Sequence, residues 1–137
     1  MTPIHAFIGL GSNLDDPAAQ LLRGFAALSS LEGCVLLARS SLYRSAPVGF
    51  AAQPDFVNAA ALVATTLPPR RLLAALHAIE AAHGRRREFR NGPRTLDLDL
   101  LLYGGTTMDE HDLMLPHPAA HLRAFVLEPL LEIAPDC

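Results

Sequence analysis

The 137-residue chain has only two cysteines and no apolar run of the length that crosses a membrane. Cys34 and Cys137 form neither a metal-like spacing nor a disulfide framework, so we expect free thiols. A membrane helix needs roughly 18 or more consecutive apolar residues, and the sequence contains no such run. Segment 1–16 lacks the basic flank and cleavage site of a signal peptide. We therefore expect a cytoplasmic protein without membrane contact.

Lysine is absent, and all 11 basic residues are arginines, against 14 acidic residues. A net charge of −3 argues against a general nucleic-acid binder, and aromatic residues make up only 6% of the chain. Five of the arginines nevertheless cluster at Arg85, Arg86, Arg87, Arg90 and Arg94. Guanidinium groups at this density suit the oxygens of a compact polyanion. The alternative interpretation is a solvated basic loop without a ligand.

Hydrophobic periodicity and turn residues divide the chain into strands and helices. We expect strands at residues 5–10, 34–45, 54–67 and 96–103, and helices at 18–31, 70–84 and 121–134. The alanine-rich segment 54–67 is open to a helical interpretation as well. Loops are expected at residues 85–94 and 108–118.

Proline and aspartate mark where the helices begin and end. Asp15, Asp16 and Pro17 supply capping chemistry for the first helix, and Pro68 and Pro69 begin the second. Gly84 is the expected C-cap of that second helix, and Pro129 is expected to interrupt the last one.

The element order predicts a single domain spanning residues 1–137. Strand, helix, strand, strand, helix and strand is the order of a ferredoxin-like α+β sandwich. We expect a mainly antiparallel sheet with helices on one face. The other face would then be free for ligands.

The stretch GPRTLDLDLLLY (92–103) places two carboxylates in an otherwise apolar strand. Alternate side chains of a strand share a face, so Asp97 and Asp99 point one way and the leucines between them the other. Burying an unpaired carboxylate is costly, so a cation is expected to meet this pair. Two carboxylates suit magnesium, which keeps waters and phosphate oxygens as its other ligands. An edge strand whose aspartates meet water or Arg94 is the alternative.

Other motifs are less specific. The glycine-rich GLGSN (9–13) lacks the lysine of a P-loop, and a tight strand-to-helix turn explains it better than a phosphate cradle. His117 lies between Pro116 and Pro118, where an ordinary surface histidine is the simplest interpretation. The remaining histidines form no ligand pattern, so we assign no zinc site.

Several stretches together resemble the 6-hydroxymethyl-7,8-dihydropterin pyrophosphokinase family, which acts in folate synthesis. The resemblance covers essentially the whole chain. It rests on GSNL (11–14), YRSAPVG (43–49), QPDFVNAA (53–60), GPRTLDLDLLLYG (92–104), LPHP (115–118) and EPLLEIAP (128–135). It implies a ferredoxin-like fold and transfer of pyrophosphate from ATP to the hydroxymethyl group of the pterin, with AMP as the other product.

The resemblance also assigns roles to individual positions. Asp97 and Asp99 are implied as ligands of two Mg²⁺ ions and, with Arg85 and Arg94, as the catalytic set. The implied ATP-binding residues are His77, Glu80, Arg85, Arg87, Arg94, Leu100, His117 and Arg123. The implied pterin-binding residues are Ser45, Val48, Phe56, Asn58, Asp97 and Phe125. No side chain is assigned as a general base.

The sequence departs from the family pattern at four of these regions. Phe56 replaces a tyrosine, Asn91 stands where a tryptophan is common, and Pro118 replaces an aromatic residue. Asp112 falls where some members carry a basic residue, which puts full neutralisation of the phosphates in question.

Two other classes of function are compatible with the same fold. A ferredoxin-like domain binds RNA through aromatic residues of its sheet, but the acidic charge and few aromatics disfavour this reading. A regulatory domain would bind a nucleotide or amino acid without turnover. We expect a monomeric enzyme whose partners are ATP and the pterin, with no nucleic acid.

Overall fold

A sheet of five strands forms the centre of the computed structural model, which describes residues 2–14, 16–46, 54–83, 95–110, 112–117 and 124–134 (of 124 and 125 only the backbone). The strands of this sheet are β1 (Ile4–Ser12), β2 (Cys34–Arg39), β3 (Tyr43–Ser45), β4 (Phe56–Thr65) and β5 (Asp97–Tyr103). The helices are α1 (Pro17–Ser29), α2 (Pro69–Ala82) and α3 (Ala124–Ile133). A separate hairpin is formed by β6 (Met108–Glu110) and β7 (Leu113–Leu115).

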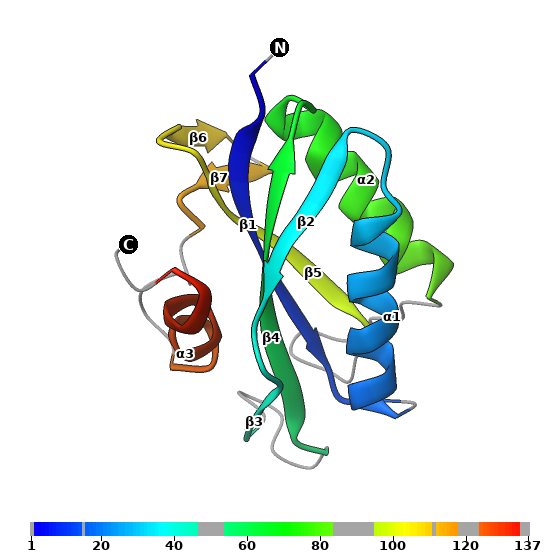
Figure 1. Cartoon of the computed structure of the whole chain (residues 1–137). Coiled ribbons are helices and arrows are strands. Elements are labelled where there is room, and N and C mark those ends of the chain that lie inside the picture. The colour runs from blue at the N-terminus through cyan, green and yellow to red at the C-terminus, as the bar shows by residue number, and fades with distance from the viewer. Residues whose placement is uncertain are drawn as a thin grey trace.

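The sheet has the strand order β2-β4-β1-β5, with β3 also paired to β4, and all of these pairs are antiparallel. This topology confirms the predicted ferredoxin-like α+β class. Helices α1 and α2 lie on one face, as predicted (Figure 1). Helix α3 lies on the other face beside β3 and β4 (Figure 1), so that face is only partly free.

Helix α1 begins where the sequence placed its capping residues. Asp16 is the N-cap, with φ of 63°, and its carboxylate accepts a hydrogen bond from the Ala19 N–H. Leu21, Phe25 and Leu28 recur at helical spacing and are at most 2% exposed. Each such side chain contributes roughly 1.5–3 kcal/mol when it leaves water. Together they anchor α1 to the sheet.

The predicted strand 34–45 is divided into β2 and β3, which is a correction to the expected boundaries. Ser40 lies at the break, and its Oγ accepts a hydrogen bond from the Ala60 N–H at 2.8 Å. A side chain here takes the place of a backbone group, so the regular ladder with β4 stops. Segment 54–67 forms β4, and its helical interpretation is wrong.

Two predictions about the C-terminal third are also wrong. Segment 108–118 was expected to be a loop but contains the β6–β7 hairpin. Helix α3 continues through Pro129 instead of stopping there, and Pro129 is fully buried. Burial of the ring accompanies the loss of one helical hydrogen bond, which proline cannot donate.

Helix α3 is tied to the sheet by one carboxylate. Glu132 accepts hydrogen bonds from the Ser41 N–H at 3.0 Å and from the Tyr43 hydroxyl at 2.6 Å. The Ser41 hydroxyl also donates to it, at 3.0 Å. We call this set the Glu132 tether.

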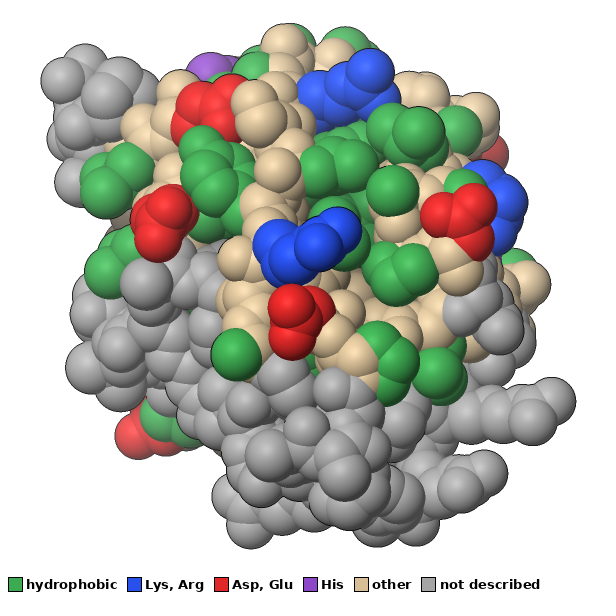
Figure 2. Space-filling view, turned by 90° about the horizontal axis from the view of Figure 1, so that it is seen from below, with side chains coloured by type: hydrophobic (Ala, Val, Ile, Leu, Met, Phe, Trp, Pro, Cys, Tyr) green, Lys and Arg blue, Asp and Glu red, His purple; other side chains and the backbone are tan. Residues whose placement is uncertain are grey.

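The described surface mixes the two signs of charge. Figure 2 shows basic and acidic side chains lying among apolar ones on the face seen from below in Figure 1. The described part of that face therefore carries no extended field of one sign. Within the described ranges, none of the helices combines the length and the apolar character that crossing a bilayer requires.

Candidate active site

The two aspartates of β5 point to the same side of the sheet. Asp97 and Asp99 are partly exposed, whereas Leu98 and Leu100, which alternate with them, are 2% exposed on the opposite side. The predicted shared orientation of the carboxylates is thus confirmed. It follows from the period of two in a strand.

Glycines of β1 lie beside both carboxylates. Gly11 pairs with Asp97, and Gly9 pairs with Asp99. The Leu101 side chain packs beside Gly9, where a Cβ atom would lie 3.3 Å from it. Because Gly11 has no side chain, the surface of the sheet next to Asp97 is free of such a group. Most of the GLGSN stretch belongs to β1. Asn13, directly after the strand, is buried, and its side-chain amide donates a hydrogen bond to the Pro54 carbonyl.

Asn58 of β4 lies across Gly11 from Asp97, in the same row of the sheet. A Cβ atom at Gly11 would lie 3.2 Å from the Asn58 Oδ1. The Asn58 amide donates from Nδ2 to the Ser45 Oγ at 2.7 Å, which fixes the plane of the amide. Ser45 in turn pairs with Phe56 along β3 and β4. The structure therefore brings together Ser45, Phe56, Asn58 and Asp97, which belong to the predicted pterin set.

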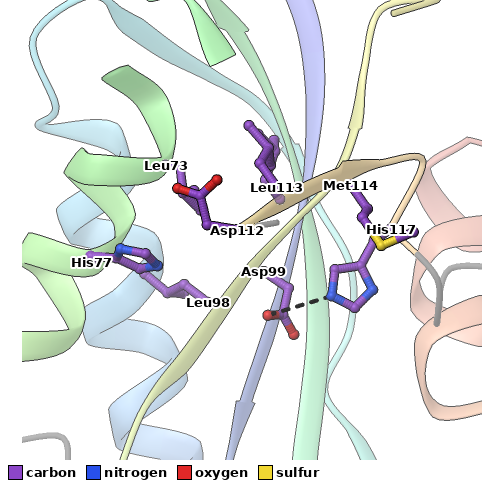
Figure 3. Close-up of a pocket in the computed structure, with 9 residues that line it drawn as sticks. Leu73, His77, Leu98, Asp99, Asp112, Leu113, Met114 and His117 are labelled. Carbon is purple, nitrogen blue, oxygen red and sulfur yellow. Dashed lines mark ion pairs between the residues drawn. The ribbon is translucent and has the colours of Figure 1, made fainter. Parts of the chain in front are cut away.

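A cavity of about 260 Å³ opens beside β5 (Figure 3). Leu73 and His77 of α2 stand on one side of it, and Asp99 and His117 on the other (Figure 3). Its remaining lining residues are Leu98, Leu100, Asp112, Leu113 and Met114. The cavity gathers His77, Asp99, Leu100 and His117, which the sequence analysis had assigned to nucleotide or metal binding.

His117 is held against β5 by its backbone. Its N–H donates to the Leu101 carbonyl at 2.9 Å, and its Nε2 lies 3.9 Å from the Asp99 Oδ1 (Figure 3). The side chains of His117 and Asp99 are 32% and 49% exposed. An anionic ligand in the cavity would therefore meet an imidazole next to a carboxylate.

Glu80 is placed differently from the other predicted nucleotide-binding residues. It is 4% exposed, and its Oε2 accepts a hydrogen bond from the Leu98 N–H at 2.8 Å. It is not among the residues that line the cavity. Its carboxylate satisfies a backbone donor on the open edge of β5, and any contact with a nucleotide stays a prediction.

Sequence reasoning missed the apolar walls of the cavity and the contribution of the hairpin. Leu73 precedes His77 by four residues, so the helical period would have placed both on one face. Leu113 and Met114 lie in the segment expected to be a loop. Nothing in that segment signalled that it would pair with itself.

Several predicted site residues lie outside the described ranges. They are Val48, Arg85, Arg87, Arg94 and Arg123. Of Phe125 the structure describes only its place in α3. Among the residues that are described, no group of three or more histidine, cysteine, aspartate or glutamate side chains is arranged to hold a metal.

Comparison with known proteins identifies the family. Residues 7–135 match the model of the family described as 7,8-dihydro-6-hydroxymethylpterin-pyrophosphokinase (HPPK). The chain is 48% identical over 133 residues to the 2-amino-4-hydroxy-6-hydroxymethyldihydropteridine pyrophosphokinase of Haemophilus influenzae. The matched region covers 97% of this chain and 83% of the relative.

Two further relatives carry the same name. The Pseudomonas aeruginosa protein is 48% identical over 132 residues, covering 96% of this chain and 82% of the relative. The Bacillus subtilis protein is 41% identical over 128 residues, covering 93% of this chain and 77% of the relative.

These matches define the class of protein as a pyrophosphokinase, a transferase of pyrophosphoryl groups. A carboxylate pair of which one member, Asp99, lines an open cavity suits that chemistry. The chain belongs to the HPPK family, and the resemblance found in its sequence motifs is confirmed.

Proposed function

We propose that the protein transfers pyrophosphate from ATP to the hydroxymethyl group of 6-hydroxymethyl-7,8-dihydropterin and releases AMP, a step of folate biosynthesis. Family membership supports the pterin acceptor and the transferred group. The observation that carries the proposal is the shared orientation of Asp97 and Asp99, of which Asp99 lines the cavity and Asp97 lies across Gly11 from Asn58.

We further propose that Asp97 and Asp99 hold magnesium, as two ions together with ATP. The donor set fits, because two partly exposed carboxylates on one face offer hard oxygen ligands and leave room for phosphate oxygens and water. Bound magnesium would supply charge neutralisation to the phosphates. The part of the reaction left to the chain is positioning and further charge compensation.

The cavity of Figure 3 is the proposed seat of the nucleoside. Leucine side chains supply apolar walls, and the outward edge of β5 at Leu100 offers backbone groups for hydrogen bonds. His117 is close enough to Asp99 to contact a phosphate that reaches the carboxylate pair. Arg85, Arg87, Arg94 and Arg123 are proposed to offset the remaining phosphate charge.

The pterin is proposed to lie over Gly11 of β1, beside Asp97. The amide of Asn58 would hydrogen-bond the edge of the ring, and Asp97 lies across Gly11 from that amide. Phe56 and Phe125 are proposed to stack on the ring, with Ser45 and Val48 completing the pocket. In this position the hydroxymethyl oxygen would attack the β-phosphorus of ATP in line, and AMP would leave.

The decisive test is AMP formation by the purified protein with ATP and magnesium chloride, with and without the pterin alcohol. We expect AMP only when the pterin is present. A protein that binds ATP but releases no AMP with the pterin would be a sensor domain, and the proposal would be wrong. The Asn58→Ala variant should raise the KM for the pterin about tenfold, since a hydrogen bond contributes about 1 kcal/mol and its orphaned partner adds to the cost. Its KM for ATP should stay within about twofold.

We also propose a monomer located in the cytoplasm. Sedimentation of the purified protein and fractionation of cells would test these two statements.

A further inference from the structure

The wall of the nucleotide cavity contributed by the hairpin is acidic. Asp112, in the turn between β6 and β7, lines the same cavity as Asp99. A polyphosphate bound there would meet a carboxylate that no metal is proposed to cover. Like charges at this range repel unless a cation offsets one of them.

Arg70 supplies a cation at this wall. Its Nη1 donates to both carboxylate oxygens of Asp112, at 2.9 and 2.8 Å, and its Nη2 bonds Glu110. One guanidinium thus joins the start of α2 to both sides of the hairpin turn. The Arg70 side chain is 47% exposed and that of Asp112 is 59% exposed. A pair this exposed contributes little to stability.

The position of Arg70 in α2 is a second observation, because a cation at the N-terminal end of a helix is unfavourable for the helix itself. Arg70 is the second residue of α2, where the helix dipole favours anions, and the first turn of α2 contains no acidic residue. Arg71 follows it and is exposed. The carboxylates that the helix start lacks arrive from the hairpin, 40 and 42 residues later in the chain.

The hairpin does not depend on Arg70 for its attachment. Leu113 and Leu115 are 5% and 3% exposed and belong to the main core, with Met108 packed against it. Two buried leucines hold a segment far more firmly than one exposed ion pair. Removing the Arg70 side chain should therefore change the charge of the cavity wall and leave the wall in place.

We propose that Arg70 is the counter-charge that makes the hairpin wall compatible with the polyphosphate of the nucleotide. Arg70 is a positioning residue that acts through Asp112. The inference rests on the proposed function, because it requires a nucleoside polyphosphate in this cavity.

The test is calorimetric binding of ATP and of adenosine, with magnesium chloride present, to the wild type and to Arg70→Met. We expect the variant to bind ATP about three- to tenfold more weakly, since the Asp112 carboxylate, without the charge of Arg70, repels several phosphate charges more strongly through partly screened solvent. Adenosine carries no charge, so its affinity should stay within about twofold. The loss for ATP should shrink as sodium chloride is added.

Two matched variants sharpen the result. Arg71→Met removes the same side chain one residue further along α2 and should bind both ligands like the wild type. Adding Asp112→Asn to Arg70→Met should restore most of the affinity for ATP, because the repelling charge is gone.

Equal losses of ATP and adenosine would mean that Arg70 only shapes the wall, and the inference would be wrong. Unchanged ATP binding in Arg70→Met would overturn it as well. The AMP assay of the wild type separates this inference from the proposed function. If Arg70→Met weakens ATP binding but not adenosine binding, and the wild type forms no pterin-dependent AMP, the function alone is rejected. If the wild type forms AMP and Arg70→Met binds ATP like the wild type, the inference alone is rejected.

Discussion

The two faces of β1 and β5 are built from neighbouring residues of the same strands, yet they differ in almost every physical respect. Toward α1 and α2, Ile8 and Leu10 of β1 are at most 3% exposed. Leu98 and Leu100 of β5 are 2% exposed on the same face and also line the cavity at the edge of the sheet. On the other side, the same strands present glycines and half-open carboxylates. One face is apolar and closed, and the other carries the carboxylates and is only partly covered, by α3 and by the buried Leu101.

Because of this difference, residues on one face of the two strands contribute mainly to stability, and residues on the other face are available for activity. The closed face removes apolar area from water, which is the main favourable term in folding. The open face keeps carboxylates where a ligand can reach them, and it gains little stability from doing so. Substitutions on the two faces should therefore affect different measurements.

The largest effect is expected on the open face. Asp97→Ala should lower kcat/KM by on the order of 10²–10³-fold, because metal assistance contributes several kcal/mol to phosphoryl-transfer reactions and 1.36 kcal/mol corresponds to a factor of ten. Its free energy of unfolding should change by less than about 1 kcal/mol. Steady-state assays of pterin-dependent AMP formation and urea unfolding measure the two quantities. Asp109→Ala, an exposed aspartate of β6, is the control and should be fully active.

The next effect is expected on the closed face. Leu10→Ala should lower the free energy of unfolding by about 2–5 kcal/mol, because a buried leucine leaves a cavity behind. Urea unfolding checks this value. Leu37→Ala on β2, where the side chain is 49% exposed, should change it by less than about 0.5 kcal/mol. A fully stable Leu10→Ala protein would show that the two faces are less distinct than we describe.

The smallest effect is expected in the Glu132 tether, where a polar contact on the α3 side supports stability. Hydrogen bonding by Tyr43, and then by the Ser41 backbone, lowers the pKa of Glu132 below its ordinary value near 4.5. A lowered pKa stabilises the folded state at pH values above the ordinary value, and this contribution is lost as the pH falls through the lowered one.

The wild type should therefore exceed Glu132→Gln in urea midpoint by a constant margin from about pH 6 to 8. The margin should shrink below pH 4.5. Glu128→Gln, an exposed neighbour on α3, should show no such narrowing. A margin that does not vary with pH would mean that the charge of Glu132 is unimportant.

The sequence was sufficient for features that follow from local periodicity. The alternation of aspartate and leucine in 97–100 predicted which side chains share a face, and the structure agrees. Asp16 and Pro17 predicted the start of α1, because helix capping also depends only on residues adjacent in the sequence.

Features that depend on distant partners were missed. The strands β6 and β7 are three residues each, too short for a clear alternation, and Leu113 becomes buried only because the core is beside it. Pro129 was expected to interrupt the last helix, but α3 continues through it, and the ring is buried against the rest of the protein. Arg70 gave no signal either, because its partners lie 40 and 42 residues away. The roles of the arginines in 85–94 stay predictions.

The outer edge of β5 is occupied at two points by groups from elsewhere in the chain. The Leu98 N–H donates a hydrogen bond to the Glu80 carboxylate, and the His117 N–H donates one to the Leu101 carbonyl. A sheet edge with free backbone groups is a template on which a second molecule adds a strand, which is how aggregation begins. The Leu98 N–H and the Leu101 carbonyl, on either side of Leu100, already have hydrogen-bond partners. The stretch of this edge that is left is too short for a strand of another chain to pair with it.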